Sequence, residues 1–259
     1  MARVYAVISG KGGVGKTTST INLGTSLNKL GEEVVILDGN LTTPNIGIHL
    51  GAPIVPITFN HVLKGEAKIE DAIYEHESGT KVIPASLSLN ETEKIDYKKM
   101  NDVIKKLKKI TNHILIDSAA GLGEEARAAI DAADEIIIVT NPEMSAVTDA
   151  LKTIKLAEEK NKKILGIIIT RYRGARTEMP VSSIREMLES NILGVIPEDE
   201  SIKESQSLKN SVILTHPKSK SSIQYINASK RVLGENIKLE NPLKTSFLSN
   251  LFKTLRLKK

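Results

Sequence analysis

The sequence predicts an α/β protein with a single doubly wound, mostly parallel sheet and helices on both faces of that sheet. Short runs rich in Val, Ile and Leu alternate along the 259 residues with stretches whose apolar side chains recur at helical spacing. Near-continuous apolar runs of this kind are typical of parallel strands that are buried on both faces. Ligands of such sheets bind at the carboxyl ends of the strands, so the residues that directly follow each run are the first candidates for function.

The elements follow one another in a regular order. Residues 4–9 form the first apolar run, and the spacing of the apolar residues in 21–30 predicts a helix that begins near Thr17 and ends at Gly31. Further strands are expected at residues 34–37, 81–83, 114–116, 136–139, 164–169 and 192–196. Further helices are expected at residues 98–109, 123–132, 144–160, 181–189 and 219–234. Because no linker-like stretch interrupts this pattern, we expect one domain over residues 1–240 and a separate C-terminal segment, residues 241–259.

A glycine-rich loop, GKGGVGKTT at residues 10–18, connects the first strand to the first helix and matches the phosphate-loop pattern GxxxxGK[ST]. Its glycines let phosphate oxygens approach a row of backbone N–H groups, and the positive end of the helix dipole points at the same place. Lys16 adds a positive charge for the β- and γ-phosphates, and Thr17 offers a hydroxyl to Mg²⁺. The loop therefore predicts a fold of the P-loop NTPase type that binds a nucleoside triphosphate. The expected ligand residues are Gly10, Lys11, Gly12, Gly13, Val14, Gly15, Lys16, Thr17 and Thr18.

Aspartates follow two of the expected strands, Asp38 after residues 34–37 and Asp117 after residues 114–116. A carboxylate in this position can hold Mg²⁺ through water beside the γ-phosphate, so the expected metal site combines Thr17, Asp38 and Asp117. Gly121 can then bring a backbone N–H to the phosphate. An aspartate at a strand end can instead serve only to cap a turn, and this alternative stays open for both residues.

The composition excludes several classes of function. The chain has no Cys, which excludes disulfides, iron–sulfur clusters and thiolate zinc sites. Residues 244–259 contain five basic residues and no acid, whereas the rest of the chain holds 31 basic and 31 acidic residues. A neutral body with 3% aromatic residues argues against nucleic acid as a partner. Since no segment resembles a signal peptide or a membrane span of ~20 apolar residues, we expect a cytoplasmic location.

Four segments together resemble the MinD/ParA family of deviant Walker A ATPases, and MinD most closely within it. The phosphate loop carries a lysine at its second position, Lys11. Residues 38–45, DGNLTTPN, resemble the family's switch I segment, and residues 117–122, DSAAGL, its switch II segment. Residues 140–143, TNPE, follow the next strand. The resemblance covers residues 2–237 and implies an ATPase with ATP/ADP and Mg²⁺ as cofactors.

The resemblance also implies roles for individual residues. Lys11 is expected to reach the partner's phosphates across an ATP-dependent homodimer, where a second cation offsets the developing charge. Asn40 stands where the family usually has an acid that orients the attacking water, and because Asn cannot accept a proton, slow hydrolysis is expected. The expected catalytic residues are Lys11, Lys16, Asp38, Asn40 and Asp117. Adenine contacts are expected near Thr170 and Arg171 and at Pro197, Glu198 and Asp199.

The C-terminal segment predicts a basic amphipathic helix that targets membranes. Its apolar side chains recur every four residues in two neighbouring rows, with basic residues opposite. The residues expected at the membrane are Leu243, Phe247, Leu248, Leu251, Phe252, Lys253, Leu255 and Arg256. Such a helix can lie in an anionic membrane surface, and two copies on a dimer bind far better than one. Packing of the tail on its own domain, or disorder, remains an alternative.

Together these features predict an ATPase that dimerises on binding Mg-ATP, associates peripherally with the membrane through its tail and is released on hydrolysis. The resemblance implies a role in spatial positioning, such as division-site placement, with a protein partner or activator that the sequence does not identify. A ParA-like DNA-partition ATPase and a slowly hydrolysing nucleotide-dependent scaffold are the alternatives.

Overall fold

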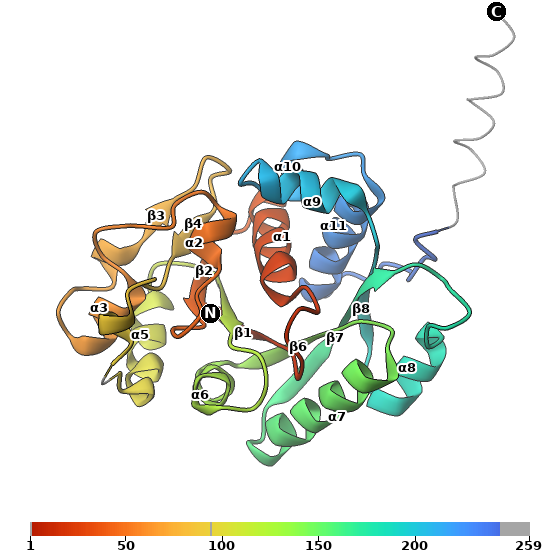
Figure 1. Cartoon of the computed structure of the whole chain (residues 1–259), viewed down its shortest axis with the longest axis horizontal. Helices are drawn as coiled ribbons and strands as arrows, with labels where there is room; N and C mark the ends of the chain where they lie inside the picture. Colours follow the sequence, from red (N-terminus) through yellow and green to blue (C-terminus); the bar gives the residue numbers. More distant parts are fainter. Residues whose placement is uncertain (1, 94, 244–259) are drawn as a thin grey trace, which may run out of the picture.

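An eight-stranded sheet runs through the centre of the structure, a computed structural model that describes residues 2–93 and 95–243 (Figure 1). The strands lie in the order β3-β4-β2-β5-β1-β6-β7-β8, and every neighbouring pair is parallel except β3 with β4. Their bounds are β1 Arg3–Ile8, β2 Val34–Gly39, β3 Tyr74–Glu75, β4 Lys81–Ile83, β5 His113–Ser118, β6 Glu135–Thr140, β7 Lys163–Tyr172 and β8 Ile192–Pro197. The predicted mostly parallel α/β fold is therefore confirmed.

Helices cover both faces of the sheet, as predicted (Figure 1). Helices α3, α5, α6, α7 and α8 share one apolar core with the strands, whereas α1, α2, α10 and α11 share the other. Their bounds, with those of α4 and α9, are α1 Lys16–Lys29, α2 Ile46–His49, α3 Phe59–Lys64, α4 Leu89–Thr92, α5 Met100–Leu107, α6 Glu124–Ala132, α7 Met144–Glu159, α8 Val181–Leu188, α9 Glu200–Ser207, α10 Val212–Thr215 and α11 Lys220–Val232.

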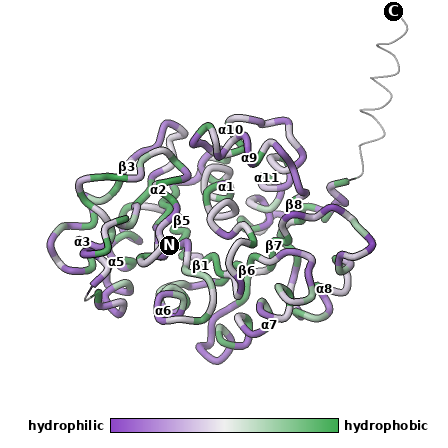
Figure 2. Tube along the Cα trace, viewed as in Figure 1, coloured by the Kyte–Doolittle hydropathy of each residue, from purple (hydrophilic) through white to green (hydrophobic). Residues whose placement is uncertain are grey.

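Alternation along the strands creates these two cores. In β5, Ile116 faces the core beneath α5 and α6, and its neighbour Leu115 faces the core beneath α1. Both side chains are fully buried, because parallel strands have helices on both sides. Figure 2 shows the same arrangement as hydrophobic colour along the central strands and hydrophilic colour on much of the outer rim. None of the described helices is long and apolar enough to cross a membrane.

The predicted strands and helices are all present, with bounds that differ by at most a few residues. The sequence did not predict the small elements of residues 41–80, the helices α4, α9 and α10, or the antiparallel strand β3. Helices α2, α3, α4 and α10 have only four to six residues, too few for an apolar period to be visible. Helix α9 is long enough, but the one residue that it buries is Ser205.

The strand order places the expected functional segments next to one another. Strand β1 pairs with β5 on one side and with β6 on the other, and β5 pairs in turn with β2. Asp38 and Asp117 are register partners at the carboxyl ends of β2 and β5, and Asp117 is also the register partner of Val7 in β1. The loop after β1 therefore begins beside both aspartates.

The loop also packs tightly against α7 at Gly10. A Cβ atom at this position would lie 2.3 Å from the backbone carbonyl oxygen of Asp149, whereas a Cβ at Gly12 would meet no atom within 4 Å. We predict that Gly10→Ala lowers the free energy of unfolding by about 1–3 kcal/mol, because the loop or α7 must move. Gly12→Ala is the matched control and should change stability far less. Urea unfolding without nucleotide checks this, and equal stability of the two variants would contradict the proposed close packing.

Candidate functional site

The glycine-rich loop is held in shape from outside by two hydroxyl groups. Thr170 Oγ1, at the end of β7, donates to the carbonyl oxygens of Val14 at 2.6 Å and Thr140 at 3.1 Å. Ser9 Oγ donates to the carbonyl oxygen of Lys11 at 3.0 Å. Gly15, which precedes the first turn of α1, has φ +86°, a conformation that glycine adopts readily. The loop thus leads directly into the N-terminus of α1, where backbone N–H groups are free to bind an anion.

Asp117 is the centre of the site and collects three donors from the first turn and a half of α1. Lys16 Nζ lies 3.1 Å from Oδ1, Thr17 Oγ1 donates to Oδ2 at 2.6 Å, and Thr20 Oγ1 donates to Oδ1 at 3.1 Å. Asp117 is fully buried and Lys16 is 8% exposed, so this ion pair is shielded from solvent. Three predicted residues, Lys16, Thr17 and Asp117, are thereby brought together. Thr20 was not predicted, although it lies one helical turn after Lys16.

Asp38 has a different set of partners. Its carboxylate accepts backbone N–H groups from Asn40 at 3.2 Å and from Asn45 and Ile46 at 3.0 Å each. These bonds close the switch I segment into a loop and cap the start of α2. Burial, and after it the charge of Asp117, raise the pKa of Asp38 to about 7. In this conformation Asp38 serves the capping role that the sequence left open.

Asn40 is engaged within the same loop. Its Nδ2 donates to the carbonyl oxygen of Thr43, while its Oδ1 accepts from the backbone N–H of Thr43 at 3.3 Å and from Thr43 Oγ1 at 3.0 Å. Asn40 is 6% exposed. Both ends of the amide therefore stabilise the loop, which gives Asn a structural advantage over an acid at this position.

A further contact, not predicted from the sequence, joins switch I to α6. Thr42 Oγ1 donates to Glu125 Oε1, and Tyr97 Oη donates to the same oxygen at 3.3 Å. Glu125 lies in the first turn of α6, directly after the switch II segment, and is 8% exposed. Burial, and then the neighbouring charge of Glu125, raise the pKa of Tyr97. Switch I is thus connected, through a buried carboxylate, to the helix that follows switch II.

Lys11 is half-exposed and pairs with the start of α7. Its Nζ lies 3.3 Å from Glu143 Oε2 and 3.4 Å from Ser145 Oγ, at the start of α7. Gly121 has φ +83° and donates its backbone N–H to the carbonyl oxygen of Ser9 at 3.0 Å. Lys11 belongs to the loop and Gly121 lies beside it, and each is bound to another part of the same chain.

A pocket of about 190 Å³, here called the base pocket, opens beside Gly15 and Thr18. Its lining contains all five residues that were predicted at or near the adenine contacts. Asp199 is nevertheless occupied: it caps α9 through Ser201 N–H at 3.0 Å and accepts Ser221 Oγ at 2.8 Å. Burial opposes its charge, but these hydrogen bonds together lower the pKa of Asp199. The full lining is Gly15, Thr18, Thr170, Arg171, Ile196, Pro197, Glu198, Asp199, Ile202, Lys203, Gln206 and Tyr225.

Two residues that join the base pocket to α1 were not predicted from the sequence. Gln206 comes from α9, whose periodicity is weak, and its Nε2 donates to Thr18 Oγ1 at 2.9 Å. Tyr225 is buried in α11, where its hydroxyl lies 3.1 Å from Ser19 Oγ. Both residues contact α1 directly, so they join the base pocket to the phosphate loop.

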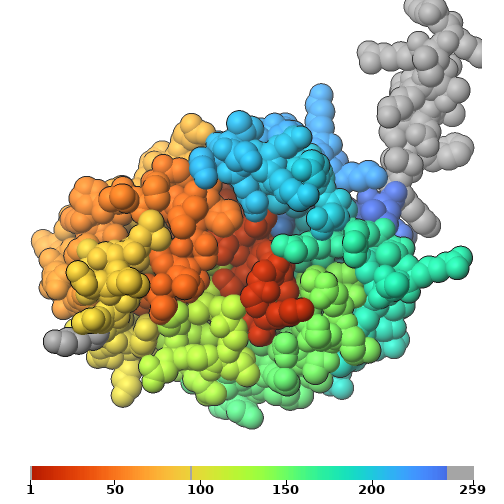
Figure 3. All heavy atoms as spheres, viewed as in Figure 1, coloured from red at the N-terminus to blue at the C-terminus, as the bar shows by residue number. Residues whose placement is uncertain are grey.

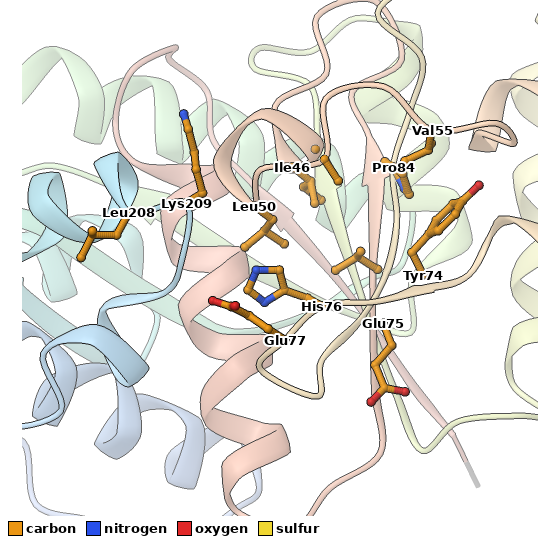
Figure 4. Close-up of a pocket in the computed structure, with 13 residues that line it drawn as sticks. Ile46, Leu50, Val55, Tyr74, Glu75, His76, Glu77, Pro84, Leu208 and Lys209 are labelled. Carbon is orange, nitrogen blue, oxygen red and sulfur yellow. The ribbon is translucent and has the colours of Figure 1, made fainter.

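A second pocket, of about 360 Å³, adjoins the switch I segment (Figure 4). Apolar side chains such as Ile46 and Leu50 line it, and His76, Glu77 and Lys209 add polar groups. Ile46 also donates its N–H to Asp38, so this pocket borders the loop that Asp38 caps. The sequence did not predict it, because its walls come from the short elements of residues 46–84 and from the end of α9.

The raised pKa of Asp38 predicts a specific dependence of stability on pH. The folded protein keeps a proton on Asp38 up to about pH 7, whereas the ordinary pKa is 3.8. Folding therefore takes up a proton in this range, and the contribution of Asp38 to the free energy of unfolding falls as the pH rises through it. We predict that Asp38→Asn, which does not titrate, gains stability relative to wild type between pH 5 and 8.

Urea unfolding without Mg²⁺ or nucleotide measures this difference. Asp71→Asn, at an exposed position, is the control and should follow the wild-type curve. Parallel curves for wild type and Asp38→Asn would show that Asp38 is already ionised at low pH.

Comparison with known proteins agrees with this geometry. The profile of the family described as "CobQ/CobB/MinD/ParA nucleotide binding domain" matches residues 5–212. An uncharacterized ATP-binding protein of Methanocaldococcus jannaschii is 35% identical over 256 residues, which cover 98% of this chain and 97% of that protein.

Two solved structures are similar over nearly the whole chain. The septum site-determining protein MinD of Pyrococcus horikoshii, complexed with Mg-ADP, is 36% identical with a TM-score of 0.86, and the match covers 92% of this chain and 100% of that one. MinD in the MinC:MinD cell division protein complex of Aquifex aeolicus is 32% identical with a TM-score of 0.85, and the match covers 93% and 99%.

Proposed function

The chain belongs to the CobQ/CobB/MinD/ParA nucleotide-binding family, and from this premise we propose that it is a MinD-like ATPase whose phosphate loop binds Mg-ATP. The observation that carries this proposal is the cluster around Asp117. It places a lysine, a threonine hydroxyl and a carboxylate at the N-terminus of α1, which is the donor set that a magnesium-bound triphosphate requires. The relative from Pyrococcus horikoshii with Mg-ADP supports the same ligand.

The residues of the site fit both the metal and the nucleotide. Thr17 Oγ1 and Asp117 are hard oxygen donors 2.6 Å apart, and they would hold Mg²⁺ directly and through water. The metal would neutralise charge on the β- and γ-phosphates. Lys16 would leave Asp117 for the phosphates, which replaces one buried ion pair by another. The base pocket then receives the adenine beside Gly15 and Thr18.

We propose that ATP joins two copies of the chain and that Lys11 takes part in the contact. Lys11 is half-exposed, and its partners, Glu143 and Ser145, are surface groups that it can exchange at little cost. A second cation beside the γ-phosphate of the partner would stabilise the transition state of hydrolysis.

Lys11→Ala tests this part of the proposal. The variant should bind ATP with near wild-type affinity but fail to dimerise, because Lys11 makes no contact with Asp117. Light scattering with Mg-ATP measures the mass, and Lys29→Ala, an exposed lysine at the far end of α1, is the control. A dimer that persists in Lys11→Ala would rule out this role.

Hydrolysis is proposed to be slow because Asn40 cannot accept a proton from water. Asn40→Asp should raise turnover, by up to ~100-fold if the carboxylate acts as a general base. The gain has a structural cost, since an aspartate cannot donate to the carbonyl oxygen of Thr43. Asn40→Ala loses the same hydrogen bond without adding a base and is the control. Equal phosphate release by the Asp and Ala variants would mean that another group orients the water.

Membrane association through residues 244–259 is proposed from the sequence, because this part of the tail lies outside the described residues. Removal of 244–259 should abolish ATP-dependent binding to anionic liposomes and leave ATP hydrolysis unchanged. Higher salt should weaken binding of the full chain, since five basic residues contribute to it. Co-sedimentation is the measurement. A truncated chain that still pellets with liposomes would contradict the proposal, and tighter binding of wild type to duplex DNA would favour a partition function.

The biological role that fits these properties is spatial positioning, such as division-site placement. The named relatives are septum site-determining and cell division proteins, and one of them forms a complex with a second protein, MinC. We propose that this chain likewise binds a protein partner when it is dimeric.

A further inference from the structure

A basic loop borders the point at which the described chain ends. Residues 171–178, RYRGARTE, include the end of β7 and most of its connection to α8, and residues 173–177 are all exposed. Leu243 packs on this loop, because a Cβ atom at Gly174 would lie 2.5 Å from Leu243 Cδ1. Figures 1 and 3 show the loop at the right-hand margin of the molecule, next to the blue segment that ends at Leu243. The tail therefore leaves the domain beside the loop.

Glu178 gives the loop a fixed shape. Its carboxylate accepts the backbone N–H groups of Arg173, Gly174 and Ala175 at 3.0, 2.8 and 3.3 Å, and Arg173 Nε at 3.2 Å. The side chain of Glu178 is only 6% exposed, whereas that of Arg173 is 66% exposed. The backbone of Met179 is tied in turn to Pro142 through a hydrogen bond of 2.9 Å. The single acid of the loop is thus turned inward, where it pairs with Arg173 Nε, and the side chains of Arg173 and Arg176 are exposed.

The loop and the sequence of the tail both carry an excess of positive charge. Arg176 is exposed and forms no ion pair with any residue of 2–93 or 95–243. From residue 236 to the C-terminus the sequence contains one acid, Glu240, against six basic residues. Glu198 borders the base of the loop, where its N–H bonds the carbonyl oxygen of Tyr172 at 3.0 Å. Arg173 and Arg176 lie further along the loop, next to the contact with Leu243.

We propose that Arg173 and Arg176 form a second contact with an anionic membrane surface, beside the tail. This inference rests on the proposed membrane association of residues 244–259. Phe247 is only four residues from Leu243, at most ~14 Å of extended chain and ~6 Å of helix. Insertion of that side chain therefore keeps the headgroups within ~14 Å of the loop, which is less than two Debye lengths of ~8 Å. Phospholipid rather than DNA is the expected anion because apolar residues follow at once in the tail.

The loop would fix the orientation of the domain on the membrane, which the tail alone does not do. An amphipathic helix at the end of the chain adds affinity for the membrane but does not by itself orient the domain. Two arginines on a rigid loop would hold the edge of the sheet at β8 against the membrane. Each arginine near an anionic surface should strengthen binding about five-fold, and the factor applies once per subunit in a dimer.

The experiment compares full-length variants in co-sedimentation with Mg-ATP and vesicles of phosphatidylcholine, with or without phosphatidylserine. Arg176→Ala should weaken binding to the phosphatidylserine vesicles by about 5- to 25-fold. Arg176→Lys should restore it, since the charge is retained. The control is Lys106→Ala, which should bind like wild type. Lys106 is an exposed lysine on α5, the helix before β5, whereas the loop follows β7 towards the other end of the strand order. Arg176 lies outside the phosphate and base sites, so ATP hydrolysis without vesicles should not change.

The outcomes separate this inference from the proposed function. If removal of 244–259 abolishes binding but Arg176→Ala binds like wild type, the loop contact is overturned and the membrane function stands. If the full chain and the truncated chain bind vesicles equally, both are overturned. Equal losses in Arg176→Ala and Lys106→Ala would show an effect of net charge rather than of the loop, and would also overturn the inference.

Discussion

The buried ion pair between Lys16 and Asp117 is the interaction on which the rest of the site depends. Asp117 lies in the middle of the sheet, where an ionised carboxylate without partners would be strongly destabilising. Lys16, Thr17 and Thr20 supply those partners from α1, and so they fix the start of this helix against the end of β5. The loop of residues 10–15 has to span the short distance from β1 to the same point. A ligand that takes over Lys16 and Thr17 must therefore supply its own compensation to Asp117, and Mg²⁺ does so.

The need of buried Asp117 for partners also links the two switch segments to the presence of a ligand in the site. Asp38 stands beside Asp117 in the sheet, and their proximity contributes to the raised pKa of Asp38. Asp38 in turn holds residues 40–46 through backbone N–H groups, and Thr42 connects this loop to Glu125 on α6. A change of charge at Asp117 can thus reach both segments through direct contacts. The surface on which Lys11 and the switch segments lie is the one proposed to meet a second copy.

The sequence predicted the parts of this arrangement that local chemistry determines. Strands buried on both faces need apolar runs, and a loop that approaches phosphate needs glycine, so residues 4–18 and the position of Asp117 could be predicted directly. The role of Asp38 could not, because metal ligation and capping need the same carboxylate and differ only in which backbone folds over it. The roles of Gln206 and Tyr225 could not be predicted from the sequence either. They come from helices that join the site only through the packing of α9 and α11 on α1.

The most direct test of the account is a calorimetric titration of Mg-ATP into wild type and Lys16→Ala. Lys29→Ala, which alters the exposed end of the same helix, is the control. Lys16→Ala should lose detectable binding, because it removes the positive charge that binds the phosphates and leaves Asp117 buried beside only two hydroxyl groups. Lys29→Ala should bind like wild type. Wild-type affinity in Lys16→Ala would contradict binding at the phosphate loop and would place the nucleotide elsewhere.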